Sequence, residues 1–153
     1  MSKQSLVLGD YRIPRTPGWR IVCLAWVFSD VDIMRILVVD DNERVRQGVI
    51  DILASKANWE VCGEAKDGTE AIEKARDLLP DVILLDISMP GLNGLETARL
   101  LRQQVSSAKI LIMSQHDPAS LLASALQAGA HGCIDKGHLG THLLSSIESI
   151  SNR

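Results

Sequence analysis

The chain has 153 residues and a formal net charge of -3, with 46% apolar and 23% charged side chains. This length suits one compact domain and is short for two. The composition excludes an intrinsically disordered or collagen-like chain, and the small negative charge provides no overall field that would attract nucleic acid. We therefore expect one globular domain that does not bind polyanions.

Cysteine content and hydropathy bear on the compartment. The three cysteines are widely spaced and form no CxxC pair, which favours a reducing cytoplasm over a disulfide framework or a zinc ribbon. The longest uncharged apolar run, residues 21–28, is much shorter than the roughly 20 residues of a membrane-spanning helix, and no small-residue cleavage site follows it. We therefore expect a cytoplasmic protein with no membrane segment and no signal peptide.

The sequence changes character near Met34. Residues 1–33 hold two of the three Trp, the only Tyr and the only Phe, and they show no sustained helical period. From Met34 onward, short apolar runs alternate with amphipathic stretches, a pattern typical of βα units around a parallel sheet. We predict that residues 1–33 are an N-terminal extension outside the core and that residues 34–153 form one α/β domain.

Five strand–helix units are predicted in chain order. The strands are expected at residues 35–39, 59–65, 81–86, 109–113 and 130–135. Each is followed by apolar residues at helical spacing; those of the second helix are Ala71, Ile72, Ala75, Leu78 and Leu79. Asn93 with Glu96, and Asp117 with Pro118, are typical of helix N-termini.

Polar residues follow four of these strands. Because parallel strands connected by helices all end at the same edge of a sheet, residues just past their carboxyl ends converge. The first strand ends at Asp40 and Asp41, the third at Asp86, the fourth at Ser114 and the fifth at Lys136. We therefore expect three carboxylates, a hydroxyl and an ammonium group to share one crevice near the protein surface.

Such a cluster indicates a metal-assisted reaction. Three neighbouring carboxylates repel one another, and a hard divalent cation such as Mg²⁺ relieves the repulsion. Mg²⁺ commonly keeps sites for phosphate oxygens, which Lys136 and Ser114 could also contact. Because Asp can attack phosphorus to give an acyl phosphate, the pattern predicts phosphoryl transfer onto a carboxylate.

Residues 36–42 (ILVVDDN) and 81–94 (DVILLDISMPGLNG), with Ser114 and Lys136, resemble the receiver domain of two-component response regulators. The resemblance covers residues 34 to about 150 and is strongest, over 86–96, to the subfamily that usually carries a LuxR-type helix-turn-helix (the NarL/FixJ-like receivers). It implies a flavodoxin-like, doubly wound, five-stranded parallel sheet in the order 2-1-3-4-5, with the site where the strand order reverses.

The resemblance also implies roles for individual residues. Asp86 would be the phospho-acceptor, and Ser114 and Lys136 would be the switch hydroxyl and the phosphoryl-binding lysine. The Mg²⁺ site would consist of Asp41 and Asp86 as direct ligands, Asp40 nearby and the backbone carbonyl of Ser88.

Three positions depart from the family. Cys133 stands where the family commonly has an aromatic residue that turns inward on activation. Gly137 stands where proline is frequent, and Gln115 stands where a small residue is usual. Cys133 and Gln115 are therefore candidate modulators of activation and of phosphoryl lifetime.

The resemblance implies a signalling domain and not an enzyme. A sensor histidine kinase or a small phosphodonor would supply the phosphoryl group. The fourth helix, fifth strand and fifth helix (residues 118–150) would form the output face, which could also form a homodimer. We expect no DNA-binding domain, because too few residues follow the fifth unit for the roughly 60 that a helix-turn-helix domain needs.

Two alternatives remain at this stage. A degenerate receiver would keep these residues and act as an interaction module without being phosphorylated. An aspartate-nucleophile phosphatase would use the same nucleophile and metal, but such enzymes usually have a second acid/base Asp where this chain has Ser88.

Overall fold

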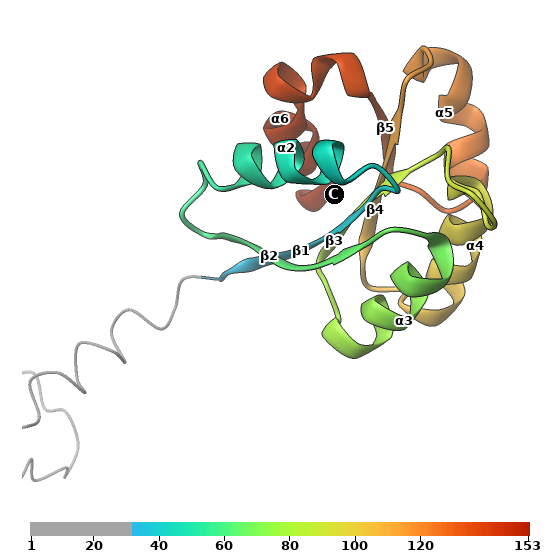
Figure 1. Ribbon diagram of the computed structural model, residues 1–153, viewed down its shortest axis with the longest axis horizontal. Helices are drawn as coiled ribbons and strands as arrows, with labels where there is room; N and C mark the ends of the chain where they lie inside the picture. Colours follow the sequence, from blue (N-terminus) through green and yellow to red (C-terminus); the bar gives the residue numbers. More distant parts are fainter. Residues whose placement is uncertain (1–31) are drawn as a thin grey trace, which may run out of the picture. The chain divides into compact units, whose positions relative to one another are not determined.

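The computed structural model describes residues 32–153 (Figure 1). The elements are β1 (Met34–Val39), α2 (Glu43–Leu53), β2 (Trp59–Ala65), α3 (Gly68–Leu78), β3 (Val82–Asp86), α4 (Gly94–Gln104), β4 (Lys109–Ser114), α5 (Pro118–Gln127), β5 (Gly132–Asp135), a 3₁₀ turn (Lys136–His138) and α6 (Leu139–Ser151). The proposed extension at residues 1–33 lies, up to residue 31, outside the described residues.

The five strands form one sheet in the order β2-β1-β3-β4-β5, and every neighbouring pair is parallel. This confirms the predicted order. At the carboxyl edge, Asp86 of β3 pairs with Met113 of β4, and Ser114 pairs with Asp135 of β5. The polar ends of the strands therefore lie in register along one edge.

Helices cover both faces of the sheet, with α2 and α6 on one face and α3, α4 and α5 on the other (Figure 1). The side chains of β1 alternate between the two layers: Ile36 and Val38 pack toward α2 and α6, whereas Leu37 and Val39 pack toward α3 and α4. Because β1, β3 and β4 are buried on both sides, their sequences read as continuous apolar runs.

The predicted helix starts are confirmed. Asn93 and Glu96 form a reciprocal capping box at α4, and Asp117 caps α5 with Pro118 as its first residue. A further N-cap, Asn42, opens α2 by accepting the amide of Arg44 at 3.0 Å. The caps at Asn42 and Asn93 lie at the ends of the two loops, after β1 and after β3, that adjoin the acidic residues.

The prediction that Leu79 belongs to the apolar face of α3 is wrong. Leu79 is 64% exposed, and its backbone is left-handed, with φ of 48°. Pro80 follows directly, and a residue before proline is disfavoured in the helical region. The helix therefore ends at Leu78, and Leu79 turns away from the core.

None of the helices between residues 32 and 153 has the length and the apolar character needed to cross a bilayer.

Candidate functional site

Three carboxylates meet at the carboxyl edge of the sheet. One carboxylate oxygen from each of Asp40, Asp41 and Asp86 lies within 4.8 Å of the others. Asp41 is exposed, but Asp40 and Asp86 are 0% and 1% exposed. The expectation that these strand-terminal carboxylates lie near the surface is therefore wrong for two of them, because β1 and β3 are central strands whose last residues remain covered.

Lys136 bridges the two buried carboxylates. Its Nζ lies 2.6 Å from Oδ2 of Asp40 and 2.9 Å from Oδ1 of Asp86, and only 11% of its side chain is exposed. Burial by itself would lower the pKa of Lys136, but the hydrogen bonds to Asp40 and Asp86 outweigh it and raise this pKa. Lys136 is therefore held as an ammonium ion between two anions.

Backbone amides fix the orientation of both buried carboxylates. The amide of Asn42 donates to Oδ1 of Asp40 at 2.8 Å, and the amide of Ser88 donates to Oδ1 of Asp86 at 3.2 Å. Within the described part of the chain, Oδ2 of Asp86 has no hydrogen-bond partner. Each carboxylate is thus oriented by its own loop, and one oxygen of Asp86 remains available.

The protonation of Asp86 reflects this environment. Burial raises the pKa of its carboxyl group above the usual range, and the nearby charge of Asp40 raises it further. The hydrogen bond from Lys136 lowers it but does not cancel the rise. An additional cation at this position would relieve the repulsion between the two carboxylates.

The donor set fits a hard divalent cation. Three carboxylates converge, one buried oxygen lacks a partner, and oxygen ligands are those that Mg²⁺ prefers. Ser88 lies in the loop after Asp86 and is exposed. The residues of this edge therefore suit Mg²⁺.

Ser114 lies at the same edge without contacting the carboxylates. It is buried at the end of β4, directly after the residue that pairs with Asp86. Its Oγ accepts the amide of His116 at 3.0 Å. Because that oxygen accepts and does not donate in this contact, the hydroxyl proton can be directed toward another acceptor.

The two candidate modulators lie outside the cluster. Gln115 is exposed in the loop after β4. Cys133 is half-buried in β5, where it pairs with Ile112 of β4, and burial raises the pKa of its thiol. Neither side chain has a polar contact with the acidic residues among those described.

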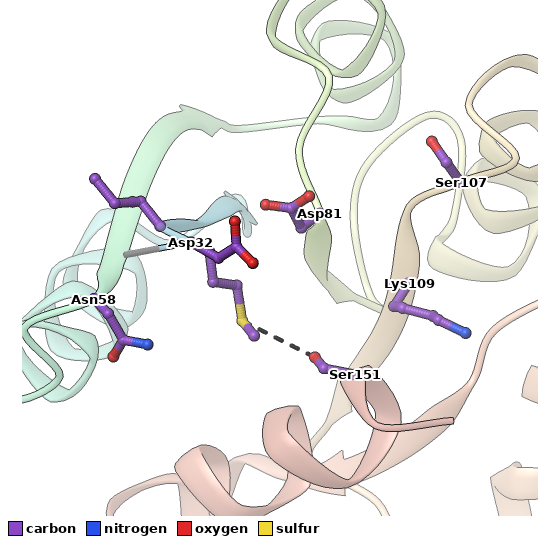
Figure 2. Close-up of a pocket in the computed structure, with 8 residues that line it drawn as sticks. Asp32, Asn58, Asp81, Ser107, Lys109 and Ser151 are labelled. Carbon is purple, nitrogen blue, oxygen red and sulfur yellow. Dashed lines mark hydrogen bonds between the residues drawn. The ribbon is translucent and has the colours of Figure 1, made fainter. Parts of the chain in front are cut away.

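A separate hollow of about 420 Å³ lies at the opposite, amino-terminal edge of the sheet (Figure 2). Asp81 points into this region and accepts the backbone amide of Arg35 at 2.7 Å. Ser151, which also lines it, donates from Oγ to Sδ of Met34 at 3.9 Å. This hollow shares no residue with the acidic cluster.

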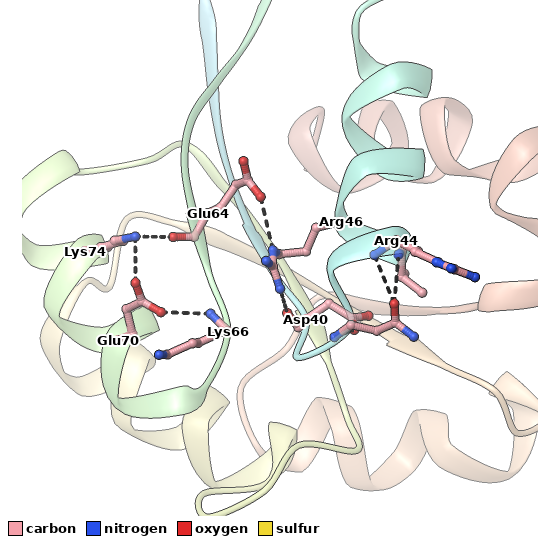
Figure 3. A network of polar contacts seen from close by, with 9 residues as sticks. Asp40, Arg44, Arg46, Glu64, Lys66, Glu70 and Lys74 are labelled. Atoms are coloured by element: carbon pink, nitrogen blue, oxygen red, sulfur yellow. Dashed lines mark hydrogen bonds and ion pairs between the residues drawn. The ribbon is translucent and has the colours of Figure 1, made fainter.

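Sequence reasoning missed the residues that hold the loop after β1. Arg46 donates from Nη1 to the backbone carbonyl of Asp40 at 2.7 Å (Figure 3). Asn42 caps the following helix. The available signal was weak: Arg46 lies in the first turns of the helix that follows Asp40. Nothing local distinguishes it from the other charged residues of that helix.

Comparison with known proteins agrees with this geometry. The family model for the response regulator receiver domain matches residues 36–148. The response regulator UvrY of Escherichia coli K12 is 38% identical over 117 residues, which cover 76% of this chain and 54% of UvrY. The response regulator GacA of Pseudomonas viridiflava is 40% identical over 104 residues, 68% of this chain and 49% of GacA.

Solved structures show the same fold. The signal receiver domain of NarL from Mycobacterium tuberculosis has a TM-score of 0.74 and 34% identity, covering 79% of this chain and 98% of that one. The response regulator domain of Thermotoga maritima CheB has a TM-score of 0.72 and 35% identity, with the same coverage. The chain belongs to the response regulator receiver family of two-component systems and has its flavodoxin-like fold. It spans about half the length of the curated relatives it matches.

Proposed function

We propose that this receiver domain accepts a phosphoryl group on Asp86 in a Mg²⁺-dependent reaction in the cytoplasm. The donor is the phosphohistidine of a sensor kinase or a small phosphodonor. The observation that carries the proposal is the pairing of Asp86 with Lys136 through Oδ1 while its buried Oδ2 has no hydrogen-bond partner among the described residues.

In this mechanism a carboxylate oxygen of Asp86 attacks phosphorus. The new P–O bond gives an acyl phosphate, and the bond from phosphorus to the donor atom breaks, so that the donor leaves with its electron pair. The ammonium of Lys136, now between Asp40 and Asp86, would neutralise a phosphoryl oxygen. The Ser114 hydroxyl would donate to another phosphoryl oxygen.

Mg²⁺ would be held by Asp40, Asp41, Asp86 and the backbone carbonyl of Ser88, and would supply positive charge to the phosphoryl oxygens. Asp40 and Asp41 would help to hold that positive charge beside Asp86, and the ammonium of Lys136 supplies a second positive charge there. The protein therefore contributes chiefly position and charge, which is what phosphoryl transfer requires.

The output face of this proposal is formed by α5, β5 and α6, the fourth helix, fifth strand and fifth helix of the sequence prediction. Leu122 and Leu126 of α5 are 41% and 51% exposed there. Exposed leucines of this kind suit a protein partner or a second receiver. Phosphorylation would change this face through Ser114, which pairs with the last residue of β5.

The proposal is tested by intact mass after incubation with acetyl phosphate and Mg²⁺. We expect the wild type to gain one phosphoryl group, Asp86→Asn to gain none, and the exposed control Asp77→Asn to behave as the wild type. No added mass with acetyl phosphate or with a phosphorylated kinase would favour the degenerate receiver. Steady-state hydrolysis of a small phosphate ester would favour the phosphatase.

A further inference from the structure

The side chain of Arg46 ties the end of β1 to the end of β2. Its Nη1 donates to the backbone carbonyl of Asp40 at 2.7 Å, and its Nε donates to Oε2 of Glu64 at 3.1 Å (Figure 3). Only 16% of the Arg46 side chain is exposed. One guanidinium group thus makes two directional contacts, which its rigid geometry allows and a lysine ammonium cannot reproduce.

The backbone of Asp40 is held on both sides. Its amide donates to the carbonyl of Ala65 at 3.1 Å, and its carbonyl accepts from Arg46. Ala65 directly follows Glu64, so both contacts lead to the same end of β2. The chain is therefore clamped to the end of β2 at Asp40, the first of the two acidic residues.

Glu64 is itself supported from α3. Lys74 donates to the backbone carbonyl of Glu64 and pairs with Glu70 at 2.8 Å, and Glu70 accepts the amide of Lys66 at 2.9 Å (Figure 3). The pairing with Lys74 lowers the pKa of Glu70, which favours the ionised form of this carboxylate. The network fixes the position of the β2 end to which Arg46 is anchored.

We infer that Arg46 and Glu64 are a positioning pair that sets the placement of Asp40 and Asp41 for the divalent cation, an inference that rests on the proposed function. The pair does not touch the phosphoryl group. It acts through the Asp40 backbone, since outer partners of metal-binding groups fix the orientation of the ligands.

The charge of Arg46 and its positioning role predict opposite changes in Mg²⁺ binding when Arg46 is replaced. Arg46 carries a positive charge next to a cation site, so its removal would strengthen Mg²⁺ binding if charge alone mattered. Removal of the clamp would weaken binding if position matters. Likewise, Glu64→Gln removes a negative charge but keeps an oxygen that can accept from Arg46.

The experiment measures Mg²⁺ binding by titration calorimetry with no phosphodonor present. We expect Arg46→Gln to raise the dissociation constant about tenfold, within the range known for outer partners of metal ligands. Arg46→Lys should weaken binding also, because it keeps the charge but makes at most one of the two contacts. Glu64→Gln should bind as the wild type does, and Glu64→Ala more weakly.

The Mg²⁺ dependence of phosphorylation by acetyl phosphate gives a second readout. In Arg46→Gln the half-saturating Mg²⁺ concentration should rise, while the rate at saturating Mg²⁺ stays close to that of the wild type. A general folding defect would lower both. Thermal unfolding of each variant is measured alongside, so that a loss of stability is distinguished from a loss of Mg²⁺ binding.

The matched control is Lys56→Gln, which breaks the ion pair between Lys56 and Glu148 (2.6 Å) at the opposite edge of the sheet. It should leave Mg²⁺ binding unchanged. An Arg46→Gln protein that binds Mg²⁺ as tightly as the wild type, or more tightly, would overturn the inference alone. If the wild type itself bound no Mg²⁺ and gained no phosphoryl group, the proposed function would be overturned, and with it the inference that rests on it.

Discussion

Asp86 and Lys136 come from the ends of β3 and β5, which are separated in the sheet by β4, and yet their charged atoms lie 2.9 Å apart. The long side chain of Lys136 crosses the end of β4 to reach Asp86 and Asp40. Ser114 ends that intervening strand. This crossing brings a cation, two buried carboxylates and a hydroxyl to one short segment of the sheet edge.

The first prediction concerns the stability of Asp86→Asn. The pKa of Asp86 is raised in the folded protein, chiefly by burial and also by Asp40, so its ionised form is less favourable there than in the unfolded chain. A raised folded pKa gives stability that is present below the unfolded value of about 3.9 and is lost as pH rises through the folded pKa. Without Mg²⁺ at neutral pH, Asp86→Asn should therefore be more stable than the wild type.

Urea unfolding of both proteins over a pH series tests this. The difference in unfolding free energy should shrink as pH falls from the folded pKa of Asp86 toward about 3.9. Added Mg²⁺ should stabilise the wild type more than the variant, because binding to the folded state adds to stability. Equal Mg²⁺ responses would contradict the role of Asp86 as a ligand.

The second prediction concerns Gly94, the first residue of α4. A Cβ at this position would collide with the backbone carbonyl oxygen of Asp86 and would come within 2.5 Å of the Cα of Ile87. Both obstacles are backbone atoms, so the loop after β3 must shift. Gly94→Ala should cost about 1–3 kcal/mol of stability and should slow phosphorylation of Asp86.

Gly48 provides the matched control. It lies within α2 and a Cβ there would meet nothing within 4 Å. Gly48→Ala should stabilise the protein by about 0.5–1 kcal/mol, because alanine loses less backbone entropy in a helix. Thermal unfolding and the rate of acetyl phosphate labelling measure both variants. If the two substitutions had the same effect, the close approach at Gly94 would have no consequence.

The third prediction concerns His131, the residue directly before β5. Its Nδ1 accepts the amide of Ile110 at 3.0 Å, which requires that nitrogen to be unprotonated. Burial lowers the pKa of His131, and the charges of Lys109 and Arg102 lower it further. The contribution to stability is therefore present above the unfolded pKa of about 6.5 and is lost as pH falls through the folded pKa.

His131→Asn keeps an acceptor near the position of Nδ1 and does not titrate. Its unfolding free energy should vary less than that of the wild type as pH falls below about 6.5. A His131→Asn profile that followed the wild type would exclude this titration.

The sequence was sufficient for the elements and for the edge at which Asp40, Asp41, Asp86 and Lys136 meet, because strand ends in a parallel sheet converge whatever lies between them. It was not sufficient for the burial of Asp40 and Asp86. That burial depends on which segments cover the ends of the central strands β1 and β3, and the pattern of a strand does not specify them.

Arg46 illustrates the same limit. Its two partners, the carbonyl of Asp40 and the side chain of Glu64, belong to different strands, and the choice of Arg46 over Arg44 depends on which way the helix faces. A helical period gives that direction only for apolar residues that must be buried. The prediction for Leu79 was wrong for a related reason. Leu79 is itself left-handed and precedes Pro80, so the helical period that placed it on the core face ends before it.

The lysine bridge also determines which ions suit the pocket. With Asp40, Asp41, Asp86 and Lys136 all ionised, three carboxylates and one ammonium leave two net negative charges within a few ångströms. A monovalent ion such as sodium would balance half of that charge, whereas one divalent ion would bring it to neutrality. Lys136 thereby makes the pocket electrically matched to a single doubly charged ion.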